Sequence, residues 1–151
     1  SWRRMPALQS PWFVPHVTAY MIAYALCAMA FILLLLRVAR RRGGDVEAAG
    51  RCDGAIGRLV RLAFPFMTFG LVSGALWAEQ AWGAYWSWDP KETWSLITWM
   101  LYAAFLHARP LPRLARVADL SHALGFAALL TTFFLVNLLP RLGSILHSYA
   151  R

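Results

Sequence analysis

Four apolar stretches, separated by charged or turn-forming segments, set the hydropathy pattern of this chain. They cover approximately residues 12–36, 62–78, 90–108 and 120–139. A helix that crosses the hydrocarbon core of a membrane needs roughly 20 mostly apolar residues. The pattern therefore predicts an all-α integral membrane protein with about four transmembrane helices, forming one domain over residues 1–151.

Composition supports this class. Of the 151 residues, 60% are hydrophobic and 15% are charged, whereas soluble domains average about 45–50% apolar and about 25% charged residues. A soluble globule, a disordered chain and a disulfide scaffold are therefore all disfavoured. The two cysteines, Cys27 and Cys52, form no C-x-x-C motif.

The net charge of +8 would suggest nucleic-acid binding in a soluble protein, but here the positions of the charges predict topology. Ten basic residues lie between the first and second stretches or between the third and fourth, and five lie on the other side. The positive-inside rule places the larger set in the cytoplasm. Both termini and the loop at 79–92 are then extracytoplasmic, and no nucleic-acid partner is expected.

The start of the third stretch carries a helix-capping signal. Asp89, Pro90 and Glu92 fit the N-cap, N1 and N3 positions of one helix, with Glu92 completing a capping box. Both acids thus have a structural role before any catalytic one. Nineteen residues at about 1.5 Å each bring His107 close to the cytoplasmic end of this helix.

The tryptophans are distributed unevenly. None lies on the predicted inner side, and six of the eight crowd between residues 77 and 99, around the 79–92 loop. An interfacial aromatic belt is one interpretation. A platform on which a large flat ligand stacks is the other, and it explains the concentration around one loop better.

The histidines give a second pattern. His16 and His147 are both predicted on the outer side, together with the tryptophans, where each alone could simply anchor a helix end. As a pair they suit the two faces of a haem, whose iron is often held by two axial imidazoles. His107 and His122 lie near the inner surface; His107 is the stronger candidate for an interior pathway, and His122 is expected only to bond a neighbour or a headgroup.

These residues carry a family resemblance. The run Trp82-Gly83-Ala84-Tyr85-Trp86-Ser87-Trp88-Asp89-Pro90-Lys91-Glu92-Thr93-Trp94 resembles the tryptophan-rich WWD signature of the haem-handling membrane proteins of cytochrome c biogenesis, and most closely the CcsA (ResC) branch of System II. Leu106-His107-Ala108-Arg109, Leu146-His147-Ser148-Tyr149 and the segment from Leu8 to Val17 resemble the histidine motifs of that branch. Its members are typically longer, so the chain is expected to match their C-terminal part.

The resemblance implies roles for these residues. His16 and His147 would be axial ligands of haem b, a bound substrate, and His107 a transient ligand on its route through the membrane. The other residues of the site would come from the WWD loop and its flank: Trp82, Gly83, Trp86, Trp88, Asp89 and Glu92. Lys91, Arg141 or Arg3 could pair with the haem propionates.

The function implied is that of a haem-handling subunit of a cytochrome c synthase (haem lyase) complex in the bacterial plasma (inner) membrane. It would present haem for thioether attachment to the C-x-x-C-H motif of apocytochrome c, beside a CcsB (ResB)-like membrane partner and membrane lipid. The alternative is a haem exporter or chaperone subunit that relays haem without attaching it. A structural membrane subunit with an aromatic belt is a third, non-haem interpretation.

Overall fold

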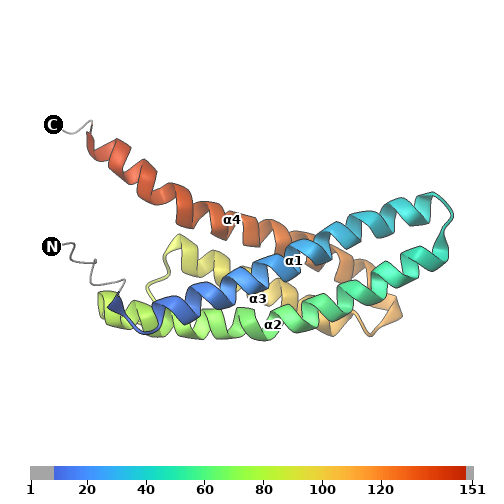
Figure 1. Cartoon of the computed structure of the whole chain (residues 1–151), viewed down its shortest axis with the longest axis horizontal. Coiled ribbons are helices and arrows are strands. Elements are labelled where there is room, and N and C mark those ends of the chain that lie inside the picture. Colours follow the sequence, from blue (N-terminus) through green and yellow to red (C-terminus); the bar gives the residue numbers. More distant parts are fainter. Residues whose placement is uncertain (1–8, 149–151) are drawn as a thin grey trace.

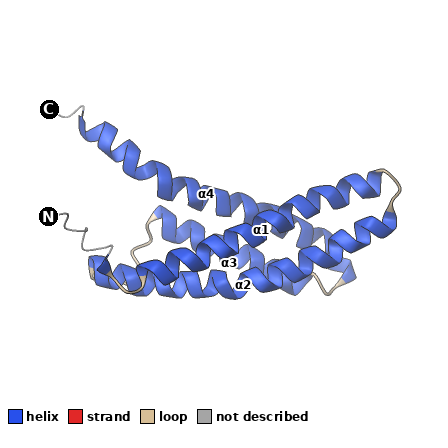
Figure 2. Ribbon diagram, viewed as in Figure 1, coloured by secondary structure: helices blue, strands red, loops and turns tan. Residues whose placement is uncertain are grey.

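The computed structural model describes residues 9–148, with side chains described within residues 9–135. Four long helices account for nearly all of it: α1 (Phe13–Arg42), α2 (Val46–Trp82), α3 (Pro90–Ala108) and α4 (Ala115–Ser148), with a short 3₁₀ turn, η2 (Pro112–Leu114), before α4 (Figure 1). The described residues contain no strand (Figure 2). The prediction of an all-α membrane protein is therefore confirmed.

Three of the helices are long and apolar enough to cross a membrane: α1, α2 and the Pro112–Leu135 part of the chain. Helix α3 is not among them, since polar Lys91 and Glu92 and two tryptophans, which have low hydropathy, lower the mean hydropathy of its 19 residues. Its bounds nevertheless coincide with the predicted stretch at 90–108. That α3 is a fourth membrane span stays a prediction.

Two helices extend beyond their predicted stretches. Helix α2 begins at Val46 instead of near residue 62, because Asp45 caps it and the arginines of 51–61 continue the helix. Arginine is a good helix former, so most of the charged segment between the first two apolar stretches is helical and the turn covers only residues 43–45. Helix α4 begins at Ala115 and continues past Pro140, the predicted stop, to Ser148.

The helices form two antiparallel hairpins. Helix α1 packs along α2, and α3 packs along α4, with fewer contacts between the hairpins. Small buried residues on α1, including Ala23, Cys27 and Ala30, let α2 approach closely with Val60 and Ala63. Large apolar side chains such as Met29, Ile32 and Leu35 are exposed instead, as expected for helices surrounded by lipid.

The chain therefore has two distinct ends. The start of α1, the 83–89 connection and the end of α4 lie at the left of Figure 1, and the α1–α2 turn and the α3–α4 connection lie at the right. The start of α1 and the end of α4 thus lie at the same end of the bundle as the WWD segment, and which side of a membrane this end faces stays a prediction. We call the first the outer end and the second the inner end, after that predicted topology.

Candidate functional site

A cavity of about 540 Å³ opens at the outer end, between α1, α2, the start of α3 and one turn of α4. Its volume lies within the roughly 300–1,000 Å³ typical of small-molecule sites. Its wall is mostly aromatic and aliphatic, with a few polar groups at the 83–95 side. The aromatic and histidine side chains that line it are Phe13, His16, Tyr20, Tyr24, Trp77, Trp82, Tyr85, Trp86 and Phe133.

His16 is fixed on the wall of this cavity. Its Nδ1 lies 2.8 Å from the carbonyl oxygen of Gly70 on α2. The ring packs edge-on against Tyr20, with centroids 5.1 Å apart, and at 32° to Trp77, with centroids 5.6 Å apart. Because α1 brings His16 against the part of α2 nearest the WWD segment, residues 54 positions apart in sequence meet here.

The predicted tryptophan platform is only partly assembled around the cavity. Trp77, Trp82 and Trp86 line it, and Trp77 meets Trp82 edge to face at 5.2 Å between centroids. Trp88 and Gly83 do not line it; Trp88 is 68% exposed and packs against Trp86. Trp99 lies deeper, where its Nε1 donates to the Thr68 hydroxyl 2.9 Å away and its ring stacks on Phe64.

Asp89 and Glu92 line the cavity, but both carboxylates already have partners in the chain. Asp89 accepts a hydrogen bond from the Glu92 amide at 2.9 Å, and Glu92 accepts from the amides of Ser87 and Asp89 at 2.8 and 3.3 Å. The predicted capping box is thus confirmed. These bonds fix the end of the WWD segment to the first turn of α3, so the two acids act on the site through the backbone.

Of the other two proposed ligands, His107 lies away from this cavity. His147 belongs to the last turns of α4, at the outer end, but its side chain lies outside the described residues. His107 is exposed near the inner end of α3, where its Nδ1 lies 2.8 Å from the Ala103 carbonyl oxygen. The helical phase of α3 turns Tyr102 and Phe105 into the bundle and leaves His107 on an outward face, and the role of His107 on an interior pathway stays a prediction.

The histidine inside the bundle is His122, for which only a neighbour or headgroup contact was expected. Its side chain is fully buried, and the rings of Phe31, Tyr102 and Phe105 surround it at centroid distances of 5.5–6.2 Å. Small residues on the same face of α4, such as Gly125, let Tyr102 pack closely beside it. No sequence signal distinguished this position from His107.

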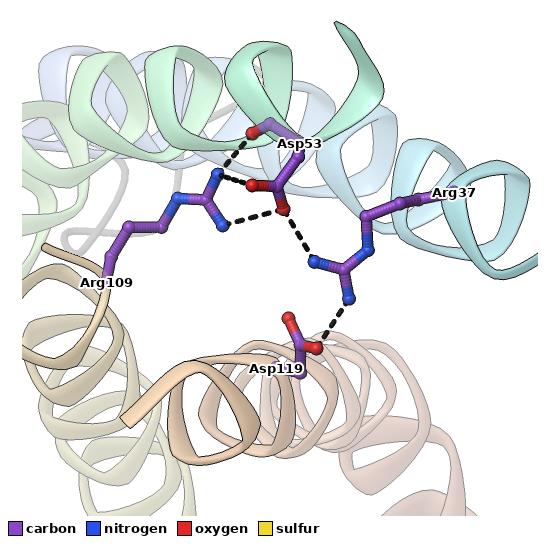
Figure 3. Close-up of polar contacts among 4 residues, drawn as sticks. All are labelled: Arg37, Asp53, Arg109 and Asp119. Carbon is purple, nitrogen blue, oxygen red and sulfur yellow. Dashed lines mark hydrogen bonds and ion pairs between the residues drawn. The ribbon is translucent and has the colours of Figure 1, made fainter. Parts of the chain in front are cut away.

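An ion-pair network that the sequence did not predict joins all four helical segments at the inner end (Figure 3). Arg37 of α1 lies 2.6 Å from Asp53 of α2 and 2.5 Å from Asp119 of α4. Arg109, at the end of α3, donates to the same Asp53 carboxylate at 2.9 and 3.1 Å and to its backbone carbonyl. Arg37 is only 5% exposed, so two of the arginines assigned to topology also hold the bundle together.

Comparison with known proteins shows which family this chain is similar to. The Cytochrome C assembly protein family matches residues 3–143. Cytochrome c biogenesis protein CcsA of Chlamydomonas reinhardtii is 40% identical, over 96% of this chain and 42% of that protein. The CcsA proteins of Mesostigma viride and Parasynechococcus marenigrum are 35% and 36% identical, each over 96% of this chain and 57% of their own length.

The chain thus spans about half the length of the curated relatives it matches. The family match, by contrast, extends over nearly all of it, including the cavity, the WWD segment and the inner ion-pair network. The chain therefore belongs to the cytochrome c assembly protein family, and its relatives make it a member of the CcsA type.

Proposed function

We propose that this chain is the haem-handling part of a cytochrome c maturation complex in the bacterial plasma membrane, holding haem b as substrate in the outer cavity. The observation that carries the proposal is the position of His16. Its Nδ1 is engaged by a backbone carbonyl, while the ring lies on the wall of an aromatic cavity. A neutral imidazole anchored in this way is typical of a metal ligand, because the second nitrogen keeps its lone pair.

The rest of the cavity suits a porphyrin. Trp77, Trp82 and Trp86 offer flat apolar surfaces to its ring. Lys91 is the one cationic side chain on the wall among the described residues, so it could pair with a propionate; Arg3 and the side chain of Arg141 lie outside the described residues. His147, which α4 carries to the same end of the bundle, would supply the second axial imidazole.

In this function the protein contributes positioning more than acid–base chemistry. Haem would be held with a vinyl edge accessible to the C-x-x-C-H motif of apocytochrome c. Each cysteine thiol would add across one vinyl double bond, its sulfur bonding to one carbon and its proton ending on the other. The histidine of the motif would replace one of the two axial imidazoles.

His107 fits a different step. Its exposed position near the inner end of α3 would let it contribute a ligand to a haem shared with a second protein. A CcsB-like membrane partner is the expected source of the opposing imidazole. We propose that this surface receives haem before it reaches the outer cavity.

The test is absorption and resonance Raman spectroscopy of the detergent-purified protein. Wild-type protein loaded with ferric haem should give a six-coordinate, low-spin spectrum, and His16→Ala and His147→Ala should each lose it, with exogenous imidazole restoring it. His122→Phe is the matched control, since it removes a buried imidazole outside the cavity and should keep the spectrum. Full haem occupancy in both alanine variants would contradict the axial assignment.

Attachment and relay are distinguished by co-expression with the partner in a host that lacks other maturation pathways. Covalent haem on a reporter cytochrome would support attachment by this complex. Haem that leaves the chain without forming thioether bonds would support the alternative, an exporter or chaperone subunit. No Soret band in protein purified from haem-replete cells would favour a structural membrane subunit.

A further inference from the structure

His16 lies in a recess of α2 that only glycine can form. A β-carbon added at Gly74 would lie 2.7 Å from Cε1 and 2.9 Å from Nδ1 of the His16 ring, closer than real Cβ contacts. At Gly70, one turn earlier, a β-carbon would lie 2.8 Å from the Tyr20 ring. The two glycines therefore let two side chains of α1 lie directly on the α2 backbone.

The same recess determines which nitrogen of the His16 ring carries the proton. A carbonyl oxygen can only accept, so the 2.8 Å contact between Nδ1 and the Gly70 oxygen requires Nδ1 to donate. In the neutral imidazole, Nε2 is then the unprotonated nitrogen. Within the described part of the chain, no hydrogen bond engages Nε2, and a β-carbon at Gly74 would lie 3.7 Å from it, which is ordinary contact.

The ring is also held from its remaining sides. Tyr20 approaches its edge and Trp77 lies beside its face. Displacing the ring from Gly74 would therefore lengthen the Nδ1 bond to Gly70, because the aromatic neighbours leave it little other room. Position, orientation and tautomer all depend on the same turn of α2.

We propose that Gly70 and Gly74 are positioning residues that hold His16 as the Nδ1–H tautomer and present Nε2 as a preformed ligand to the outer cavity. Gly70 acts through its carbonyl oxygen and Gly74 through the absence of a side chain. That the ligated group is haem iron rests on the proposed function; the positioning itself does not. Loss of a group that hydrogen-bonds to a metal-binding histidine and orients it typically lowers metal affinity about 10–100-fold.

The decisive variant is Gly74→Ala, with Gly50→Ala as its matched control. Both substitutions add one methyl group to α2 and raise its helix propensity equally. A β-carbon at Gly50, however, would have no atom within 4 Å. The first readout is ¹⁵N NMR of histidine-labelled, haem-free protein in detergent, with the His16 signals identified by their loss in His16→Gln. Wild type and Gly50→Ala should show a protonated Nδ1 and an unprotonated Nε2, and Gly74→Ala should lose this pattern.

The second readout is titration with ferric haem. Gly74→Ala should bind about 10–100-fold more weakly than Gly50→Ala, with a growing five-coordinate fraction that added imidazole converts back. A wild-type protein protonated at Nε2 would overturn the proposal even if Gly74→Ala failed to fold, and so would a Gly74→Ala protein with unchanged tautomer and affinity. Wild-type protein with the expected tautomer but no haem binding would instead contradict the proposed function alone.

Discussion

The two ends of the bundle differ in how their polar side chains are partnered. At the inner end, Arg37, Asp53, Arg109 and Asp119 pair with one another across four helical segments. At the outer end, His16 is anchored through one nitrogen beside a cavity of about 540 Å³. The inner end is closed by charges that neutralise each other, and the outer end is open and lined with rings.

The difference shows what each end is built for. A charge buried among apolar helices is costly unless a partner lies within reach, so the inner network fixes the helices relative to one another. An anchored imidazole beside an aromatic cavity has one nitrogen left for a ligand from outside the chain. The ion-paired end thus provides a rigid base from which the helices present the cavity.

The largest effect is expected from breaking the inner network. Arg37→Ala should destabilise the protein by about 3 kcal/mol, since removing one member of a buried pair typically costs about 3–5 kcal/mol and here the acids are about one-third exposed. Unfolding in detergent, followed by circular dichroism, measures this. Arg40→Ala is the control, because that side chain is 58% exposed and its acid lies 3.5 Å away.

The same experiment tests whether the two ends are independent. The folded fraction of Arg37→Ala should bind ferric haem as wild type does, because the network contains no residue of the cavity. A stability loss no larger than that of Arg40→Ala would show that the buried pair is not structural. A normal stability with altered haem binding would show that the ends are coupled instead.

A smaller effect is expected at the two aspartate N-caps, of which one lies at each end. Asp45 caps α2 at the inner end, accepting from the Ala48 amide at 3.0 Å, and Asp89 caps α3 at the outer end. Replacing either by alanine should cost about 1 kcal/mol of unfolding free energy. Only Asp89→Ala should also weaken haem binding, because Asp89 and Glu92 together hold the WWD segment against the cavity.

Hydrogen exchange and haem titration of the two cap variants measure this contrast. Faster exchange at the Ser87 and Glu92 amides should accompany the weaker binding in Asp89→Ala. Equal haem affinity in the two variants would mean that the order of the WWD segment does not matter to the site.

The features predicted from sequence are those set by local chemistry. The Asp89-Pro90-Glu92 capping signal located the start of α3 at the residue where the structure has it. The end of α4 was misjudged at Pro140, although proline is tolerated within membrane helices when neighbouring groups satisfy the freed carbonyl. The first turns of α2 were also missed, because the arginines after Asp45 make this part of the helix polar and it shows no apolar stretch.

The features missed depend on packing between distant segments. Arg37 and Asp119 are 82 residues apart, and each alone resembles an interfacial charge. Which histidine is buried in the bundle depends on helical phase against a partner helix, so the full burial of His122 was not predicted. The recess at Gly70 and Gly74 is visible only when α1 lies against it, although both glycines stand in the printed sequence.

The smallest effect is expected for an exposed ion pair on α2, which tests whether burial determines the strength of the inner network. Arg51 and Glu47 lie 2.6 Å apart on α2, the same separation as Arg37 and Asp53, but their side chains are 67% and 86% exposed. Arg51→Gln should therefore cost only about 0.3–0.5 kcal/mol. That cost should disappear near 1 M salt, where the screening length falls to about 3 Å, while the cost of Arg37→Ala should persist. Unfolding of both variants at low and high salt measures this, and equal costs would show that distance rather than burial governs the inner end.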